Sequence, residues 1–166
     1  MNIVIRKGNH SDLQGFLFLT RQVRQNMANP EWFAIDPEEE LREMMENGTM
    51  DLWMAEDSAR LAAVFSAVRP GLQPFNLGYE LELSLEELLR VIHMDTAAVD
   101  QDYRGRKLQK RMMEHAEHSY PVGTILLCTI HPDNRFSLEN ALSLGYRVEK
   151  KIAKYGSIRY ILRKDI

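Results

Sequence analysis

The chain has 166 residues, of which 45% are apolar and 27% are charged, as in an ordinary soluble globular domain. Its net charge of −3 argues against a general nucleic-acid binder, and no apolar run reaches the roughly 20 residues that a membrane-spanning helix needs. The single cysteine, Cys128, excludes an internal disulfide, and no signal peptide is visible. We therefore expect one cytoplasmic domain over residues 1–166, without a nucleic-acid or membrane partner; a homodimer is left open.

The first half of the chain is predicted to form a strand, two helices and a β-hairpin. In chain order these are residues 2–6, 11–27, 36–47, 50–56 and 60–68. Ser11 and Gln14 form the capping box expected at the start of the first helix. Asp36, followed by Pro37, is expected to cap the second helix, which Gly48 ends.

The second half begins with a Pro- and Gly-rich loop over residues 69–79 and a short helix capped by Ser84 and Glu87. Alternating strands and helices follow. With the short helix, these elements are residues 84–90, 91–99, 104–118, 124–130, 133–144, 146–154 and 157–163. The order β-α-α-β-β-(α)-β-α-β-α-β-β predicts an α/β fold in which a central mixed sheet has helices on both faces.

The helix predicted over residues 104–118 has a charge order opposite to the usual one. Five cations lie in its first turns, and Glu114 and Glu117 lie toward its end. A helix N-terminus carries partial positive charge and favours acidic neighbours, so this order is explained if an anion occupies that end. We therefore predict that a strand, a turn at Gly105 and the following helix together bind phosphate oxygens. The alternative is a solvated basic helix face.

Two segments resemble motifs of one known family. AAVDQDYRGRKLQKRMM, residues 97–113, resembles the acetyl-CoA pyrophosphate loop of the GCN5-related N-acetyltransferase (GNAT) superfamily, and HPDNRFSLENALSLGY, residues 131–146, resembles its second motif. The predicted element order also matches that fold over essentially the whole chain. The resemblance implies an enzyme that uses acetyl-CoA, without a metal, to acetylate a primary amine of a small molecule or peptide.

The resemblance also implies which residues contact the cofactor. The backbone of Ala97, Ala98 and Val99 would pair with the pantetheine arm like an added strand. Asn134 would hydrogen-bond the cofactor near the pantetheine. The turn and the following residues would surround the pyrophosphate; they are Arg104, Gly105, Arg106, Lys107, Leu108, Gln109 and Lys110.

The sequence departs from the family pattern at several positions. Lys107 and Gln109 stand where glycines are usual, and we expect helical backbone angles there, which need no glycine. Ala141 replaces a frequent Tyr general acid, and Thr129 replaces a Glu base of some members. These differences keep open a CoA-binding regulatory domain that has lost catalysis. A phosphate-loop nucleotide binder is less well supported, because both of its glycine motifs are missing.

His93 and Asp95 are the candidate catalytic residues, because they are polar, lie on the predicted central strand and share one of its faces. His93 would be the general base, oriented by Asp95, near the position where histone-type relatives carry Glu. The alternative is a strand histidine that is simply hydrogen-bonded. His131 is expected to have a positioning role, because no second ligand lies at a metal-site spacing, and Cys128 is expected to be inert packing.

Two further groups of residues are candidate parts of an acceptor groove. The aromatic residues Trp32, Phe33, Phe75 and Tyr79 would form its wall or would pack the loops that carry them. The acidic run 38–40 would attract an amine or would be an ordinary acidic helix start.

Overall fold

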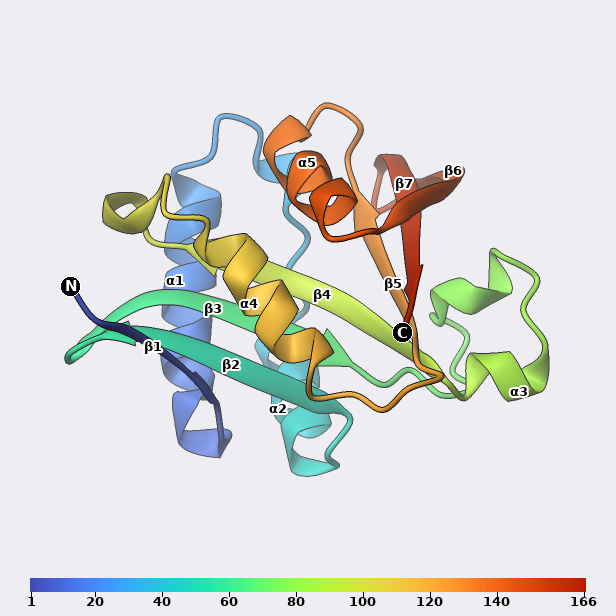
Figure 1. Ribbon diagram of the computed structural model, residues 1–166, viewed down its shortest axis with the longest axis horizontal. Helices are drawn as coiled ribbons and strands as arrows, with labels where there is room; N and C mark the ends of the chain where they lie inside the picture. Colours follow the sequence, from blue (N-terminus) through green and yellow to red (C-terminus); the bar gives the residue numbers. More distant parts are fainter. The chain divides into compact units, whose positions relative to one another are not determined.

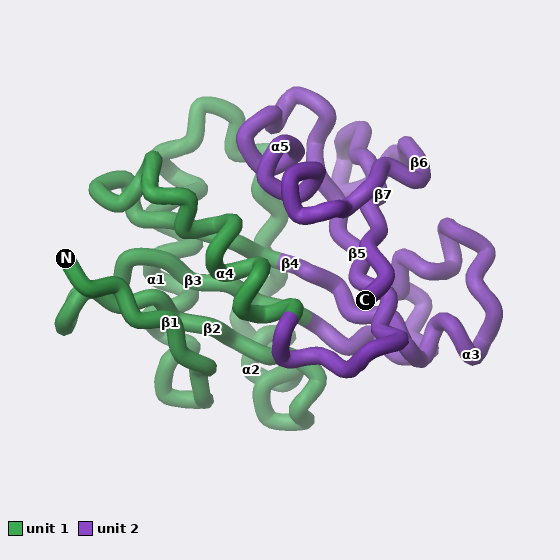
Figure 2. The backbone as a smooth tube through the Cα atoms, viewed as in Figure 1, with its two compact units in different colours: residues 1–67, 96–117 green, residues 68–95, 118–166 purple.

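A computed structural model describes all residues, 1–166, and the chain divides into two compact units (Figure 2). Unit 1 comprises residues 1–67 and 96–117, and unit 2 comprises residues 68–95 and 118–166. The hydrogen-bonded strand order is β1-β2-β3-β4-β5-β7-β6, with a parallel β4–β5 pair beside antiparallel pairs. The predicted mixed-sheet α/β fold is thus confirmed. The prediction of a single domain stays a prediction.

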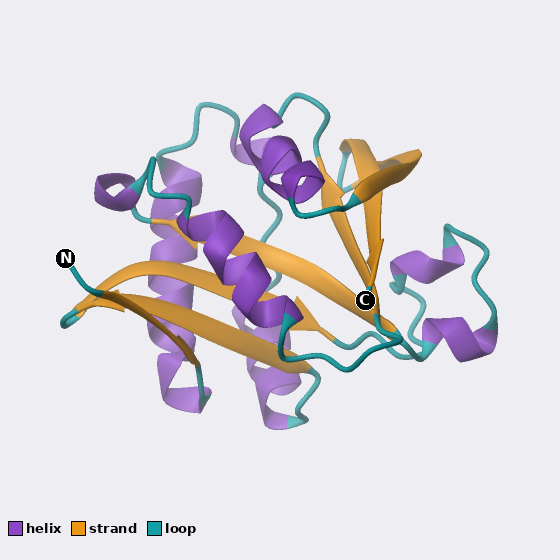
Figure 3. Cartoon of the chain, viewed as in Figure 1, coloured by secondary structure: helices purple, strands orange, loops and turns teal.

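Unit 1 places helices on both faces of its strands (Figures 1 and 3): α1 and α2 cover one face and α4 covers the other. Its elements are β1 Ile3–Lys7, α1 Leu13–Gln25, α2 Glu38–Glu46, β2 Met50–Asp57, β3 Arg60–Val68, of which residue 68 belongs to unit 2, and α4 Leu108–Glu117. Because both faces are covered, β2 and β3 are buried over most of their length. Trp53 and Phe65 pack there with ring centroids 6.0 Å apart.

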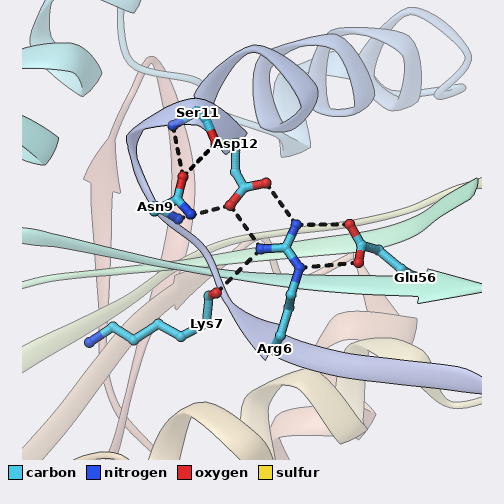
Figure 4. A network of polar contacts seen from close by, with 6 residues as sticks. All are labelled: Arg6, Lys7, Asn9, Ser11, Asp12 and Glu56. Atoms are coloured by element: carbon cyan, nitrogen blue, oxygen red, sulfur yellow. Dashed lines mark hydrogen bonds and ion pairs between the residues drawn. The ribbon is translucent and has the colours of Figure 1, made fainter. Parts of the chain in front are cut away.

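An ion-pair network joins β1, β2 and the start of α1 (Figure 4). The Arg6 guanidinium donates to both carboxylate oxygens of Asp12, at 2.9 and 2.8 Å, and to both oxygens of Glu56, at 2.8 and 3.1 Å. Its hydrogen bonds hold the pKa of the Asp12 carboxyl below the ordinary value. Asn9 and Asp12 form a capping box on the 3-10 turn His10–Asp12 that leads into α1. Two pairs of charges therefore fix where the first helix begins.

Unit 2 contains the parallel strand pair and the terminal hairpin. Its elements are α3 Leu85–Leu88, the first part of β4 Val91–Val99, β5 Ile125–Ile130, α5 Arg135–Ser143, β6 Arg147–Lys154 and β7 Ser157–Asp165. Leu77, Val91, Leu127 and Ile161 belong to one hydrophobic cluster, against which Ile152 packs. The loop before α3 therefore covers one face of these strands.

The structure corrects several predicted helix starts. The predicted capping box of Ser11 and Gln14 is not formed; the capping box lies on the preceding 3-10 turn, between Asn9 and Asp12. The second helix begins at Glu38 with Pro37 at the N-cap, so Asp36 does not cap it. Neither α1 nor α2 has a side-chain hydrogen bond at its own N-cap, although both helices begin within a turn of the predicted residue.

The largest correction concerns the basic helix, because α4 begins at Leu108 and not at residue 104. A separate 3-10 turn, Gln101–Tyr103, precedes it. Arg104, Arg106 and Lys107 therefore lie in a loop before the helix, and only Lys110 and Arg111 lie in its first turn. The predicted strand over residues 91–99 and the short capped helix before it are confirmed.

Candidate functional site

The loop before α4 is held in unit 1 by a polar cluster on the β2–β3 hairpin. Tyr103 is buried and its hydroxyl donates to the Asp57 carboxylate at 3.1 Å. Arg60 donates to the carboxylates of Asp100 and Asp102, and its guanidinium carbon lies 5.1 Å from the centre of the Tyr103 ring. The Asp100 carboxylate also accepts the N–H of Asp102 at 2.9 Å. These contacts fix the end of β4 and the 3-10 turn, and so the point at which the loop departs.

The loop itself contains two residues in the left-handed region, Gly105 with φ +78° and Lys107 with φ +58°. The expectation of helical backbone angles at Lys107 was therefore wrong. A non-glycine residue in this region costs roughly 1–2 kcal/mol, so Lys107 occupies a conformation that glycine would adopt more easily. This is one of the positions at which the GNAT pattern usually has glycine. The chain keeps the left-handed turn without glycine at this position, between the cluster around Tyr103 and the start of α4.

The backbone and charges of this loop suit an anion. The first α4 hydrogen bond runs from the Arg111 N–H to the Lys107 carbonyl at 3.0 Å. The amides of the preceding helical residues thus have no carbonyl partner within the helix. Arg104, Arg106 and Lys107 are exposed, and the guanidinium of Arg106 lies over the Tyr103 ring at 5.5 Å. A phosphate group at this end would meet backbone donors and cations together.

The parallel pairing of strand β4 with β5 ends at His93. Its parallel ladder with β5 consists of the pairs Val91–Ile125, Ile92–Leu126 and His93–Leu127. Ala97, Ala98 and Val99 lie further along β4, past the end of this ladder. Their predicted pairing with a pantetheine arm stays a prediction, and β4 offers a continuous extended backbone for it.

His93 is buried and makes a specific structural contact. Its Nε2 accepts the backbone N–H of Leu77 at 3.1 Å, which places the proton of the neutral ring on Nδ1. The Phe75 ring meets the imidazole edge-on, with centroids 6.1 Å apart. Burial, and secondly the charge of Lys154, lower the pKa of His93 to about 4. The general-base role stays a prediction, but these contacts argue against it, because the basic nitrogen is already occupied and weakly basic.

The loop that His93 holds is itself rigidly built around Asn76. The Asn76 side chain is buried; its Nδ2 donates to the carbonyls of Gly71 and Leu88, at 2.7 and 3.2 Å, and its Oδ1 accepts the Gly78 N–H at 2.8 Å. Sequence reasoning did not identify Asn76, since an asparagine in a Pro/Gly-rich loop gives no signal of long-range bonding. The predicted loop residues Phe75 and Tyr79 are about half-exposed on this frame.

The other predicted residues are placed as follows. Asp95 is exposed on β4, two residues beyond His93 on the same face. Asn134 is the N-cap of α5, where its Oδ1 accepts the Ser137 N–H at 3.4 Å; its amide nitrogen can donate elsewhere. His131 Nδ1 accepts the Asp133 N–H at 3.1 Å, a positioning contact. Ala141 is fully buried, so that position presents no group for chemistry.

Two of the weaker candidates have ordinary structural explanations. Burial raises the pKa of the Cys128 thiol to about 12, as expected for inert packing. In the acidic run, Glu38 accepts hydrogen bonds from Gln14, Arg21 and Arg42. Trp32 and Phe33 are half-buried in unit 1. Glu38 is therefore neutralised by neighbouring cations, as in an ordinary acidic helix start.

No group of three or more His, Cys, Asp or Glu side chains is arranged to hold a metal ion. None of the helices combines the length and apolar character needed to cross a membrane.

Comparisons with known proteins identify the fold. No protein-family model matches the sequence, and no curated protein matches it significantly. Among solved structures, NAA60 of Arabidopsis thaliana, in complex with acetyl-CoA, is similar with a TM-score of 0.74 and 15% identity, covering 99% of each chain. A GNAT-family acetyltransferase of Streptococcus agalactiae is similar with a TM-score of 0.72 and 18% identity, covering 99% of this chain and 95% of that one. The putative acetyltransferase yncA of Salmonella typhimurium, with acetyl-CoA, is similar with a TM-score of 0.71 and 11% identity, covering 99% of this chain and 94% of that one. The chain therefore has the GNAT fold along its whole length.

The environment of His93 predicts a pH dependence of stability. The folded pKa is about 4 and the ordinary value is 6.5, so the unfolded chain binds a proton between these values while the folded chain does not. The contribution of His93 is therefore complete above pH 6.5 and falls by about 3 kcal/mol as the pH drops to 4. The free energy of unfolding, measured with denaturant at each pH in this range, should depend less steeply on pH for His93→Gln than for wild type. His118→Gln, an exposed control, should leave the slope nearly unchanged; parallel curves for wild type and His93→Gln would show that His93 is not buried as described.

Proposed function

We propose that the protein is an acetyl-CoA-dependent N-acetyltransferase that acts on a primary amine of a small molecule or peptide. The observation that carries this proposal is the left-handed turn at Gly105 and Lys107 directly before α4, with three exposed cations around it. A lysine held in the left-handed region two residues after Gly105 indicates a functional turn. The GNAT fold supports the same conclusion, and the similar A. thaliana and S. typhimurium structures contain acetyl-CoA.

The residues of this chain would divide the work of holding the cofactor. The amides at the start of α4 and the cations Arg104, Arg106 and Lys107 would bind the pyrophosphate. The extended backbone of β4 after His93 would align the pantetheine arm. The Asn134 amide would donate to it near the start of α5. Acetyl-CoA supplies an activated thioester, so the protein has only to align the amine, accept its proton and polarise the carbonyl.

We assign different roles to the two predicted catalytic residues. His93 holds Leu77 and so fixes the loop that presents Phe75 and Tyr79; it is a positioning residue. Asp95 is exposed on the same strand face, where a carboxylate can take the proton of an incoming ammonium directly or through water. The imidazole of His93, in contrast, is held neutral by burial, and its acceptor nitrogen is already in use.

Turnover against a panel of amines tests the proposal. Thioester consumption should depend on an added amine, and the panel should include polyamines, aminoglycosides, amino acids and peptide N-termini. Acetyl-CoA binding without turnover of any amine would instead favour the CoA-binding regulatory domain. Absence of both binding and turnover would contradict the proposed function.

Gly105 offers a sharp test of the loop because the chain contains a matched control. Gly105 and Gly48 have φ values of +78° and +76°, and a Cβ at either position would meet no atom within 4 Å. Replacement by Val should strain the backbone similarly at both sites. Acetyl-CoA at 100 times its Kd should stabilise wild type by about 2.7 kcal/mol. In thermal unfolding we expect Gly48→Val to keep this gain and Gly105→Val to lose most of it; equal gains in both variants would show that the loop is misassigned.

The assignment of the proton acceptor is tested by pH profiles of kcat/KM with a working amine. Loss of a general base typically lowers the rate 10²–10⁴-fold, so Asp95→Asn should lose activity on that scale and lose the acidic limb. His93→Gln should lower stability and raise KM for the amine, while the acidic limb of its kcat/KM profile persists. The reverse pattern, with the limb abolished only in His93→Gln, would restore His93 as the base.

A further inference from the structure

The hairpin of β6 and β7 ends in an unusually basic segment. Residues 150–162 contain four cations, Lys150, Lys151, Lys154 and Arg159, and no Asp or Glu, although the whole chain has a net charge of −3. Lys150 pairs with Glu80 at 3.6 Å. The two acids of the hairpin, Glu149 and Asp165, pair with arginines at the other end of the strands. The positive charge is therefore concentrated toward the hairpin tip.

The strand register brings two of these cations onto one face. Ile152 lies opposite Arg159, and Lys154 lies opposite Ser157, so all four side chains project from the same side of the hairpin. Ile152 packs against the cluster that contains Leu77 and Val91, and His93 follows Val91 on the same face of β4. Lys154 and Arg159 thus belong to the face of unit 2 that carries His93. Lys151 points to the opposite side and is exposed.

The two cations flank one aromatic ring at a rigid turn. Tyr155 and Gly156, with φ values of +55° and +72°, form the two-residue turn of the hairpin. The Lys154 Nζ and the Arg159 guanidinium carbon each lie 5.3 Å from the centre of the Tyr155 ring. Tyr155 is itself more than half exposed, so solvent reaches this arrangement.

Both cations are partly or wholly withdrawn from water. Arg159 is only 3% exposed, and Lys154 is half-buried. The charge of Lys154 also reaches the imidazole of His93, whose pKa it helps to lower. Positive potential therefore extends from the hairpin to the strand that carries the proposed proton acceptor.

We propose that Lys154 and Arg159 bind a carboxylate of the amine acceptor, so that the substrate is a small amine that carries a carboxylate, such as a free amino acid. This inference rests on the proposed N-acetyltransferase function and narrows its substrate class. An ammonium group and a planar guanidinium together match the two oxygens of a carboxylate. The same cations would repel polyamines and aminoglycosides, whose remaining amines are positively charged.

The test compares amino acids with the corresponding amino-acid amides, which lack the carboxylate. Wild type should acetylate the amino acids with the higher kcat/KM. Lys154→Gln should lower that constant about 10- to 100-fold for amino acids, mainly through KM, and leave the amides nearly unchanged, because a hydrogen bond to a charged group is lost. The amino groups of an amino acid and its amide differ in their own pKa. The decisive quantity is therefore the acid-to-amide ratio, which is kcat/KM for the amino acid divided by kcat/KM for its amide, in the variant relative to wild type.

Lys151→Gln is the matched control, because it removes a lysine from the same hairpin on the opposite face. It should leave the acid-to-amide ratio unchanged. Arg159→Lys keeps the charge but removes the planar fork, and its ratio should fall as well. If that buried substitution prevents folding, Lys154→Gln alone decides.

A binding measurement separates this inference from the proposed function. N-acetylated amino acids and their amides, as product analogues, are titrated by NMR in the presence of CoA. We expect the carboxylate forms to bind more tightly to wild type than to Lys154→Gln, even if no turnover is found. Equal binding of acid and amide, or an unchanged acid-to-amide ratio in Lys154→Gln, would overturn the inference while leaving acetyl transfer intact. A rise in KM for acetyl-CoA alone would assign the cations to the cofactor and would also overturn it.

Discussion

The start of helix α4 depends on the cluster that holds Tyr103. The hydroxyl of Tyr103 is bound to Asp57, its ring lies under Arg60 and Arg106, and Arg60 also binds two carboxylates of the preceding turn. These contacts hold the end of β4 and the 3-10 turn, and Gly105 and Lys107 in the following loop lie in the left-handed region. The helix begins at Leu108, and the first amides of a helix have no carbonyl partner within it. A buried tyrosine therefore helps to position the loop that is proposed to bind phosphate.

Unit 2 uses a buried histidine for a similar purpose. His93 accepts the Leu77 amide, and Asn76 closes the loop on either side of that contact. A neutral imidazole is well suited to this, because its lone pair points at the donor and its burial keeps the ring uncharged. The same properties make it a poor proton acceptor for an amine. In the proposed function, the exposed Asp95 and not His93 therefore accepts the proton.

Much of this architecture could be predicted from the sequence. The strand over residues 91–99 has its predicted bounds because its apolar run is flanked by a capped helix and an acidic turn, and the two hairpins follow from their turn residues. The GNAT resemblance of the loop and the second motif led to the fold that the solved structures share. Local patterns sufficed wherever neighbours in sequence determine the conformation.

The errors arose where distant contacts decide. Lys107 was expected to be helical, but it lies in the left-handed region, in a loop that follows Tyr103. Tyr103 contacts Asp57 and Arg60, more than forty positions earlier in the chain. The partner of His93 lies sixteen residues earlier in a loop without regular structure. Lys154 and Arg159 lie on opposite sides of a turn, and only the observed register shows that they share a face.

The most direct test of the account is titration calorimetry with acetyl-CoA and, separately, with ATP. The loop before α4 is proposed to bind a pyrophosphate that is joined to a pantetheine arm, and not phosphate groups in general. We predict saturable binding of acetyl-CoA and much weaker binding of ATP, because ATP lacks the pantetheine arm that β4 would align. Equal or tighter binding of ATP, or no binding of acetyl-CoA, would contradict the account.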